Sequence, residues 1–531
     1  MYFILVLFLS FSFNQNFNYS SEDWFTISNP GYITSISLAG EEVLFSSENG
    51  IYSYNKYTSE LLFLEDFVRN FEAKSFHMIH YDVFRDYLWV LTEDNISYKP
   101  YSSTFWRTID FYELDLNNHY SILNLGSNSE YLFINLGSDI LVLDPYTGIL
   151  ATEEINDFSD VEWTGNSRNN LSNDFDLTMF HSFEGYSFIS NSRIEHMGRF
   201  LEITDVAADN QNIWVGTNSG EIFVCDISMR SVEKIKSMPL FSDMRLSYID
   251  DRDEWWFATN DKIALYEDIV LANDQIFILR WIENENKWIS YNQNKYPGIA
   301  SSDITCFYRD ENFLYIGTYF GLLAFNINRK KWELIDTDSG LEANHITQLS
   351  SDDGMLYIAT VAGLNMISLR DNEIVKNNYF NDFLNMEIKD LKIEGNSLFI
   401  LSQNGISLFD LTEKKYEIIV EGKFTQFIFM ENFLILSKKN KIVKYNMVSG
   451  KKNTLMNIKS IHDVSLCNDY LWISAGDHCI LLNLITNETF KYDLDDGIVG
   501  SIVRQVDCDD GWVWFTGNKG ISFYNWLKYH D

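Results

Sequence analysis

DITCFYRDENFLYIGTYFGLLAFNINRKKWELIDTDSG, residues Asp303–Gly340, is the clearest copy of a unit that recurs along this chain. It contains four short runs that are rich in β-branched and aromatic residues and bounded by Asp, Asn, Gly or Lys. The runs are Ile304–Tyr308, Phe313–Gly317, Leu322–Asn326 and Trp332–Ile335. We therefore predict four short β-strands joined by tight turns.

A residue equivalent to Tyr315 recurs at intervals close to 42 residues. Eleven residues before it, a hydrophobic residue opens the first run of most copies, and another follows three residues later, as at Ile33 and Ile36. The interval of 81 residues after Phe133 predicts a degenerate repeat within 155–200, and the interval of 59 before Tyr315 predicts an insertion near Glu267–Ile282. The equivalents of Tyr315 are Leu44, Trp89, Phe133, Trp214, Trp256, Tyr357, Phe399, Ile435, Trp472 and Trp514.

Glycine recurs between the second and third runs. Because glycine tolerates left-handed backbone angles, this position indicates a turn requirement. The motif G-T-x-x-G is followed by strands and not by a helix, so it does not indicate a phosphate-binding loop. The glycines are Gly220, Gly321, Gly363 and Gly520.

Four strands in about 42 residues are typical of a β-propeller blade. The last repeat has three runs, whereas Asp23–Ser28 resembles an isolated fourth strand, so we expect it to pair with Ile521–Trp526 and close a ring. The sequence thus predicts an all-β β-propeller over residues 23–531 with about 12 four-stranded blades, in two rings of six to seven. One ring would contain both chain ends, with a crossing between rings near 155–200 and a second boundary left open.

The chain is acidic, with 40 Lys+Arg against 76 Asp+Glu and a formal charge of −36. A field of that sign repels phosphate backbones and anionic lipid, which disfavours nucleic-acid and peripheral membrane binding. Hydrophobic residues make up 46% and aromatic residues 16%, enough for packed cores.

The N-terminus predicts export. An apolar run over Tyr2–Phe13 has the length of a signal-peptide core and is too short to span a bilayer, so we expect residues 1–18 to be a signal peptide. Later runs are shorter than about 18 apolar residues, and we expect no stable membrane insertion. The five cysteines are widely spaced without a C-x-x-C pair, which predicts buried free thiols and not a disulfide framework or metal site.

The phrases IWVGTNSG (213–220), LYIGTYFG (314–321) and LYIATVAG (356–363) resemble the two-component regulator propeller repeat. The similarity extends over most of residues 30–525. It implies bacterial, exported propellers, often periplasmic sensor parts of hybrid kinases, and PorZ-like components of type IX secretion. The chain stops at Asp531 inside a blade, and we expect neither the kinase of the sensors nor the C-terminal sandwich of PorZ-like proteins.

The sequence contains no pattern that identifies a catalytic centre. Its histidines are scattered, and neither a G-x-S-x-G elbow nor a catalytic cysteine signature occurs. Asp336–Gly340 and Asp493–Gly497 faintly resemble calcium loops but lack the closing glutamate, so we interpret them as turns and expect no cofactor beyond a weak Ca²⁺ possibility.

Candidate contact residues come from two positions of the repeat. Polar residues lie between the two hydrophobic positions of the first strand, where they could line a channel. Aromatic residues and a histidine lie in connections that open on the same face of a propeller. The candidates are Asp205, Lys389, Asp390, His462, Asp463, Arg504, Tyr296, Tyr319, Phe320 and His345.

Three functions remain open from the sequence. The first is a non-catalytic, exported binding or assembly scaffold for a protein or glycan partner, with secretion as one setting. The second is a ligand-sensing module that acts through a separate membrane kinase. The third is a propeller enzyme of the lyase or lactonase type, in which Asp205, Asp390 and Asp463 would converge on one metal ion.

Overall fold

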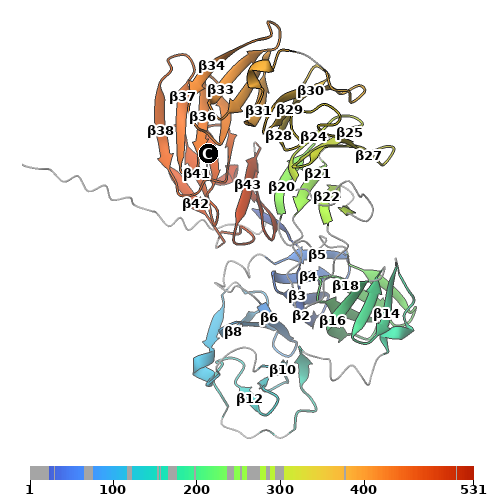
Figure 1. The fold of residues 1–531 in the computed structure, drawn as a ribbon. Helices are drawn as coiled ribbons and strands as arrows, with labels where there is room; N and C mark the ends of the chain where they lie inside the picture. The colour runs from blue at the N-terminus through green and yellow to red at the C-terminus, as the bar shows by residue number, and fades with distance from the viewer. Residues whose placement is uncertain are drawn as a thin grey trace, which may run out of the picture.

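The structure is a computed structural model, and its arrangement is shown in Figure 1. It describes residues 23–28, 30–64, 76–103, 105–116, 122–151, 155, 157–165, 176–183, 185–196, 199–235, 244–250, 254–259, 276–282, 287–292, 304–375, 378–494, 496–509 and 511–530. The predicted signal peptide, residues 1–18, lies outside these residues. No helix among the described residues is long and apolar enough to cross a membrane.

The described residues form eleven antiparallel sheets, and four of them lie between residues 33 and 235. We call these four the first propeller. Their inner strands contact one another in the series β10, β6, β2, β16. The strands are β2 (Ile33–Ala39), β3 (Glu42–Ser47), β4 (Gly50–Asn55), β5 (Glu60–Phe63), β6 (Phe76–Asp82), β7 (Tyr87–Thr92), β8 (Asn95–Pro100), β9 (Arg107–Asp110), β10 (Asn124–Ser127), β11 (Leu132–Asn135), β12 (Ile140–Leu143), β13 (Glu162–Thr164), β14 (Tyr186–Ser190), β15 (Arg193–His196), β16 (Arg199–Ala208), β17 (Asn212–Thr217), β18 (Ile222–Asp226) and β19 (Ser231–Lys234).

The other seven sheets form the second propeller, in which each inner strand contacts the next and β43 contacts β20, so the ring is closed. Its strands are β20 (Met244–Ile249), β21 (Trp255–Thr259), β22 (Ile276–Ile282), β23 (Lys287–Asn292), β24 (Ile304–Arg309), β25 (Phe313–Thr318), β26 (Gly321–Asn326), β27 (Lys331–Ile335), β28 (Ile346–Asp352), β29 (Met355–Thr360), β30 (Gly363–Ser368), β31 (Ile388–Glu394), β32 (Ser397–Ser402), β33 (Gly405–Asp410), β34 (Lys415–Glu421), β35 (Gln426–Met430), β36 (Phe433–Lys438), β37 (Lys441–Asn446), β38 (Lys452–Asn457), β39 (Asp463–Cys467), β40 (Tyr470–Ser474), β41 (Cys479–Asn483), β42 (Thr489–Tyr492), β43 (Val503–Cys508), β44 (Trp512–Gly517), β45 (Gly520–Asn525) and, from the start of the chain, β1 (Trp24–Ser28). Short 3₁₀ helices occur at Phe111–Leu114, Leu177–Met179, Asn381–Phe383 and Leu527–Tyr529.

The predicted closure by the N-terminal strand is confirmed. β1 pairs with β45 in the order β1-β45-β44-β43, with Trp24 opposite Tyr524 and Ile27 opposite Ile521. The Trp24 ring is buried and stacks on the Tyr524 ring, with centroids 4.5 Å apart. The second propeller thus joins the first and last described strands, while residues 33–235 form the first propeller as a continuous insertion.

A β-bulge explains the spacing of hydrophobic residues in the inner strands. The register between the first and second strands shifts at the same place in most sheets, for example between Ile304 and Cys306 in β24. The extra residue reverses the alternation of side chains, so hydrophobic residues three positions apart can both face the core. Ile33 and Ile36 of β2 are accordingly both buried. The recurrent glycine adopts positive φ, as at Gly321 (139°), where a Cβ atom would lie 2.8 Å from the Ile335 carbonyl oxygen.

The two predicted rings are present, and the seven sheets of the second propeller agree with the expected six to seven, whereas the described residues of the first propeller form four sheets. Residues 155–200 are no crossing between rings, because β13 contacts β6 and β16 contacts β2 of the same propeller. The change of propeller instead occurs between β1 and β2 and between β19 and β20. The expected degenerate repeat is a hairpin, β14–β15, that extends the sheet of β16–β19. Its Phe188 packs with Phe223 of β18.

The cysteine prediction is wrong for one pair. Cys467 and Cys508 form a disulfide between the ends of the neighbouring inner strands β39 and β43, with Cα atoms 6.1 Å apart. The repeat places both residues at the same end of inner strands in adjacent blades. Because they are 41 residues apart in sequence, the spacing of the cysteines did not indicate that they are close in space. The other three cysteines, Cys225, Cys306 and Cys479, are buried free thiols as predicted. A disulfide is typical of proteins outside the reducing cytoplasm.

Candidate functional site

Polar residues of the inner strands, the predicted Asp463 among them, join one blade to the next. The Asp463 carboxylate accepts a hydrogen bond of 3.0 Å from the backbone N–H of Val506 on the following blade. At the junction that closes the second propeller, Gln505 Oε1 accepts from the backbone N–H of Ser247 at 2.7 Å. Gln505 directly follows the bulge of β43, so the distorted backbone directs its side chain toward the neighbouring strand, whereas Asp463 is the first residue of β39 and pairs in regular register with Ser474.

The same arrangement occurs in the first propeller. Asp205 of β16 accepts a hydrogen bond of 2.8 Å from the backbone N–H of Ile36 in β2. Ser35 of β2 in turn accepts one of 2.9 Å from the N–H of Ile79 in β6. Asp205 and Ser35 are buried. These side chains therefore satisfy backbone donors between blades, where unpaired buried N–H groups would be costly.

Burial changes the proton affinity of the carboxyls in the second propeller. It raises the pKa of Asp463 to about 6, opposed by hydrogen bonds from Gln426 and Val506. It also raises the pKa of Asp390 and of Asp507, while the Lys392 ammonium acts in the opposite direction on both. Lys392 thus lies within electrostatic range of carboxyls on two different blades, β31 and β43.

The three candidate aspartates do not converge. Asp205 belongs to the first propeller, whereas Asp390 and Asp463 belong to β31 and β39 of the second. Within the described residues, no group of three His, Cys, Asp or Glu side chains could hold a metal ion. The predicted loop at Asp336 is a hydrogen-bonded turn, in which Asp336 Oδ1 accepts from the N–H groups of Asp338 and Ser339. Asp205, Asp390 and Asp463 therefore do not form the shared metal site that the enzyme hypothesis predicts.

Three cationic or titratable candidates lie where inner strands begin in the second propeller. Lys389 is the bulge residue between Ile388 and Asp390, and Arg504 is its equivalent in β43. His462 directly precedes β39 and is exposed. Because all inner strands of a propeller run in the same direction, these residues lie on the same face of the ring. We call it the entry face.

An aromatic pair lies on the entry face. Tyr319 and Phe320 form the turn between β25 and β26 and are 42% and 56% exposed. His345 directly precedes β28, and the centroid of its ring lies 4.2 Å from that of the Tyr319 ring. Burial lowers the pKa of His345, which favours its neutral form. The structure thus brings Tyr319 and His345 together, while the candidate Tyr296 lies outside the described residues.

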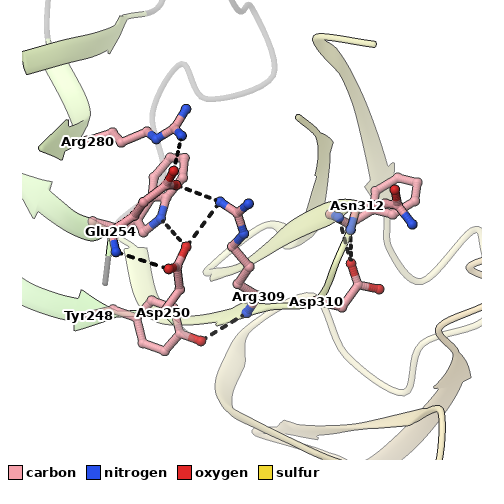
Figure 2. Close-up of polar contacts among 9 residues, drawn as sticks. Tyr248, Asp250, Glu254, Arg280, Arg309, Asp310 and Asn312 are labelled. Carbon is pink, nitrogen blue, oxygen red and sulfur yellow. Dashed lines mark hydrogen bonds and ion pairs between the residues drawn. The ribbon is translucent and has the colours of Figure 1, made fainter. Parts of the chain in front are cut away.

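At the opposite end of β20 and β24 is a buried ion-pair network that the sequence did not reveal (Figure 2). Arg309 Nη1 lies 3.1 Å from Asp250 Oδ2 and 3.0 Å from Glu254 Oε2. Arg280 Nη2 lies 2.5 Å from Glu254 Oε1, and the Trp256 indole N–H donates to Asp250 at 3.1 Å. The two carboxylates of this network belong to the β20–β21 hairpin, whereas Arg309 belongs to β24 of the next blade. Because the partners are far apart in sequence, no local motif predicts the network. Its contacts are internal and join two blades.

A second polar cluster lies between inner strands of the first propeller. His80 of β6 is buried, and its Nδ1 and Nε2 atoms each lie 2.9 Å from a hydroxyl, those of Thr164 and Ser127. Burial lowers the pKa of His80 to about 3. The ring is therefore neutral and links β6 to both β13 and β10.

Sequence analysis also missed a basic region, because only the charge of the whole chain was considered. Residues 423–459 contain eight lysines and a single acidic residue, Glu431. They span the blade β35–β38, which we call the basic blade. A window-by-window charge count would have found it. Its lysines are Lys423, Lys438, Lys439, Lys441, Lys444, Lys451, Lys452 and Lys459.

Comparison with known proteins supports the architecture. No protein-family model and no curated protein matches the chain. PorZ, an essential bacterial surface component of the type-IX secretion system of Porphyromonas gingivalis, is similar over 95% of this chain and 87% of its own, with 12% identity and a TM-score of 0.55. The extracellular domain of the hybrid two-component system BT4673 from B. thetaiotaomicron is similar over 92% of this chain and 69% of its own, with 14% identity and a TM-score of 0.42. At these identities the likeness to PorZ shows the fold.

Proposed function

We propose that the chain is an exported, non-catalytic β-propeller scaffold that binds a protein or glycan partner through the entry face of the second propeller. The observation that carries this proposal is the exposed pair Tyr319 and Phe320, placed beside His345 on a closed ring. Exposed aromatic residues on a rigid support are typical of recognition surfaces, because they bury a large area at little entropic cost.

Two further features support the proposal. Hydrogen bonds between neighbouring inner strands, such as Asp463 to Val506, fix the ring so that loops on the entry face keep their positions. The disulfide between Cys467 and Cys508 favours an exported protein. Lys389 and Arg504 would add positive charge to the contact, and His462 would add a polar ring.

Recovery of native complexes from the source organism tests this function. The tagged full chain would be compared with a Tyr319→Ala/Phe320→Ala variant by size-exclusion chromatography with light scattering. Tyr416→Ala is the matched control, because Tyr416 is also 40% exposed but lies on the outer strand β34. We expect a stoichiometric complex that the double variant loses and the control keeps. A chain recovered only as a free monomer, or equal loss in both variants, would contradict the proposal.

A further inference from the structure

The basic blade reverses the charge of the rest of the molecule. Eight lysines and one glutamate give residues 423–459 a formal charge of +7, so the remainder of the chain carries −43 within the total of −36. Charge of one sign concentrated on one surface attracts partners of the opposite sign and steers their approach. Figure 1 shows β37 and β38 of this blade at the outer edge of the second propeller.

The lysines of the basic blade are not neutralised within the chain. Among the described residues, none of the eight forms an ion pair with a carboxylate. Aromatic rings hold several in place instead. The Lys438 and Lys452 ammonium groups lie 5.0 and 6.0 Å from the Phe424 ring centroid, and that of Lys444 lies 4.2 Å from the Phe433 centroid. Their positive charges are thus positioned but uncompensated.

The outer edge of this blade is also unpaired. β38 is the last strand in the order β35-β36-β37-β38, and no described strand pairs with its outer side. An edge strand presents backbone N–H and C=O groups to any extended segment. The lysines at Lys451 and Lys452 repel the same edge of a second copy, while an acidic segment would compensate them. Charge therefore selects which strand can pair.

We propose that the basic blade docks an extended acidic segment of a partner protein, paired to the outer edge of β38. This inference rests on the proposed scaffold function and names the chemistry of one partner. A polypeptide is favoured over a nucleic acid because the field of the whole chain repels long polyanions, whereas β38 offers only a short edge. It is favoured over an anionic glycan because edge pairing uses main-chain hydrogen bonds.

A blade of the same propeller supplies a matched control. Lys330 and Lys331 occupy the turn and first position of β27, as Lys451 and Lys452 do for β38, and all four are exposed. Their blade contains Glu333 and is followed by Asp336, so it lacks the charge excess. Lys330→Gln/Lys331→Gln and Lys451→Gln/Lys452→Gln therefore remove equal charge from equivalent positions.

The probe is a fluorescent ten-residue peptide of alternating Glu and Val, with a second version in which central valines are replaced by proline. Anisotropy titrations of the full chain at low salt should show binding of the first peptide, weakened roughly fivefold by Lys451→Gln/Lys452→Gln and unchanged by the β27 variant. The proline version, with equal charge but no strand capacity, should bind more weakly.

Three outcomes would overturn the inference. Equal weakening by both lysine variants would show unspecific charge attraction. Equal binding of the proline peptide would exclude strand pairing. Binding of dextran sulfate, with no binding of either peptide, would assign the surface to anionic glycans. None of these depends on Tyr319 and Phe320, so a failure here leaves the scaffold test intact.

Discussion

Asp463 accepts a hydrogen bond of 3.0 Å from the backbone N–H of Val506, and the two residues belong to the inner strands of neighbouring blades. Asp205 and Ile36 stand in the same relationship in the first propeller, at 2.8 Å. A single device thus connects blades in both propellers, with the Asp205 side chain buried and that of Asp463 half-buried. Desolvation raises the pKa of Asp463, so the contribution of this carboxyl to stability depends on pH.

Replacement of Asp463 by Asn should change that dependence. Burial raises the pKa of Asp463 to about 6, so the folded chain holds this proton more tightly than the unfolded chain. Its stabilising contribution is therefore fully present below pH 4 and is lost as pH rises through 6. We expect the free energy of unfolding of Asp463→Asn, relative to the wild type, to rise by about 2 kcal/mol between pH 4.5 and pH 8. Urea unfolding at both pH values measures it.

The control for this prediction is Asp410→Asn. Asp410 lies on the surface, where hydrogen bonds from the N–H groups of Glu413 and Thr412 lower its pKa. Its replacement should not reproduce the gain at high pH. An Asp463→Asn variant that loses stability equally at both pH values would show that the pKa of Asp463 is not raised in the folded chain.

Closure by β1 predicts a large difference between two adjacent residues. Trp24 is 3% exposed and stacks on Tyr524, whereas Phe25, next to it, is 45% exposed. Trp24→Ala should cost about 3–5 kcal/mol because it leaves a cavity at the closing blade, and Phe25→Ala should cost less than about 1 kcal/mol. Thermal unfolding of the two variants checks this. Similar melting temperatures would mean that β1 does not close the ring.

The blades and the closure by β1 could be predicted from the sequence, because each blade is formed by a continuous stretch of about 42 residues. The repeat around Tyr315 specifies four strands, and the spare strand at Trp24 could pair only with a blade that lacked one. The sequence was not sufficient for the division into rings. Both propellers use the same blade pattern, so no local pattern assigns β1 and β2 to different propellers.

The candidate residues show the same limit. The sequence pattern of the inner strands placed Asp205, Asp390 and Asp463 in a channel. In the structure Asp205 and Asp390 follow a bulge, and the Asp205 and Asp463 carboxylates accept hydrogen bonds from a neighbouring blade. In contrast, Tyr319 and His345 come from two connections that the propeller topology brings to one face, and they lie in contact. Topology predicts which connections meet, while side-chain direction depends on the local backbone.

The disulfide gives a third prediction. Cys467 and Cys508 are separated by 41 residues in sequence, and their bond connects the last two inner strands. Loss of that crosslink in a Cys467→Ser/Cys508→Ser variant should lower the stability by about 3 kcal/mol, because the unfolded chain gains freedom. Thermal unfolding with and without reductant checks it. Reductant should lower the melting temperature of the wild type and leave that of the double variant unchanged, and an equal response would contradict the prediction.

His80 predicts an opposite pH response in the first propeller. Burial lowers its pKa to about 3, so the unfolded chain binds this proton more readily than the folded chain. Its contribution is present above pH 6.5 and is lost as pH falls toward 3, which amounts to about 2.5 kcal/mol between pH 7 and pH 4.5. Hydrogen exchange should therefore show β6, β10 and β13 losing protection at pH 4.5 in the wild type.

His80→Gln should reduce this loss, because Gln keeps polar atoms near Thr164 and Ser127 but cannot take up the proton. The strands of the second propeller serve as the internal reference in the same experiment, since Asp463 contributes most to them at acidic pH. Two results would contradict this prediction. In the first, β39 and β43 lose protection from exchange at the same pH as β6. In the second, His80→Gln leaves the acid-induced loss of protection in β6 unchanged.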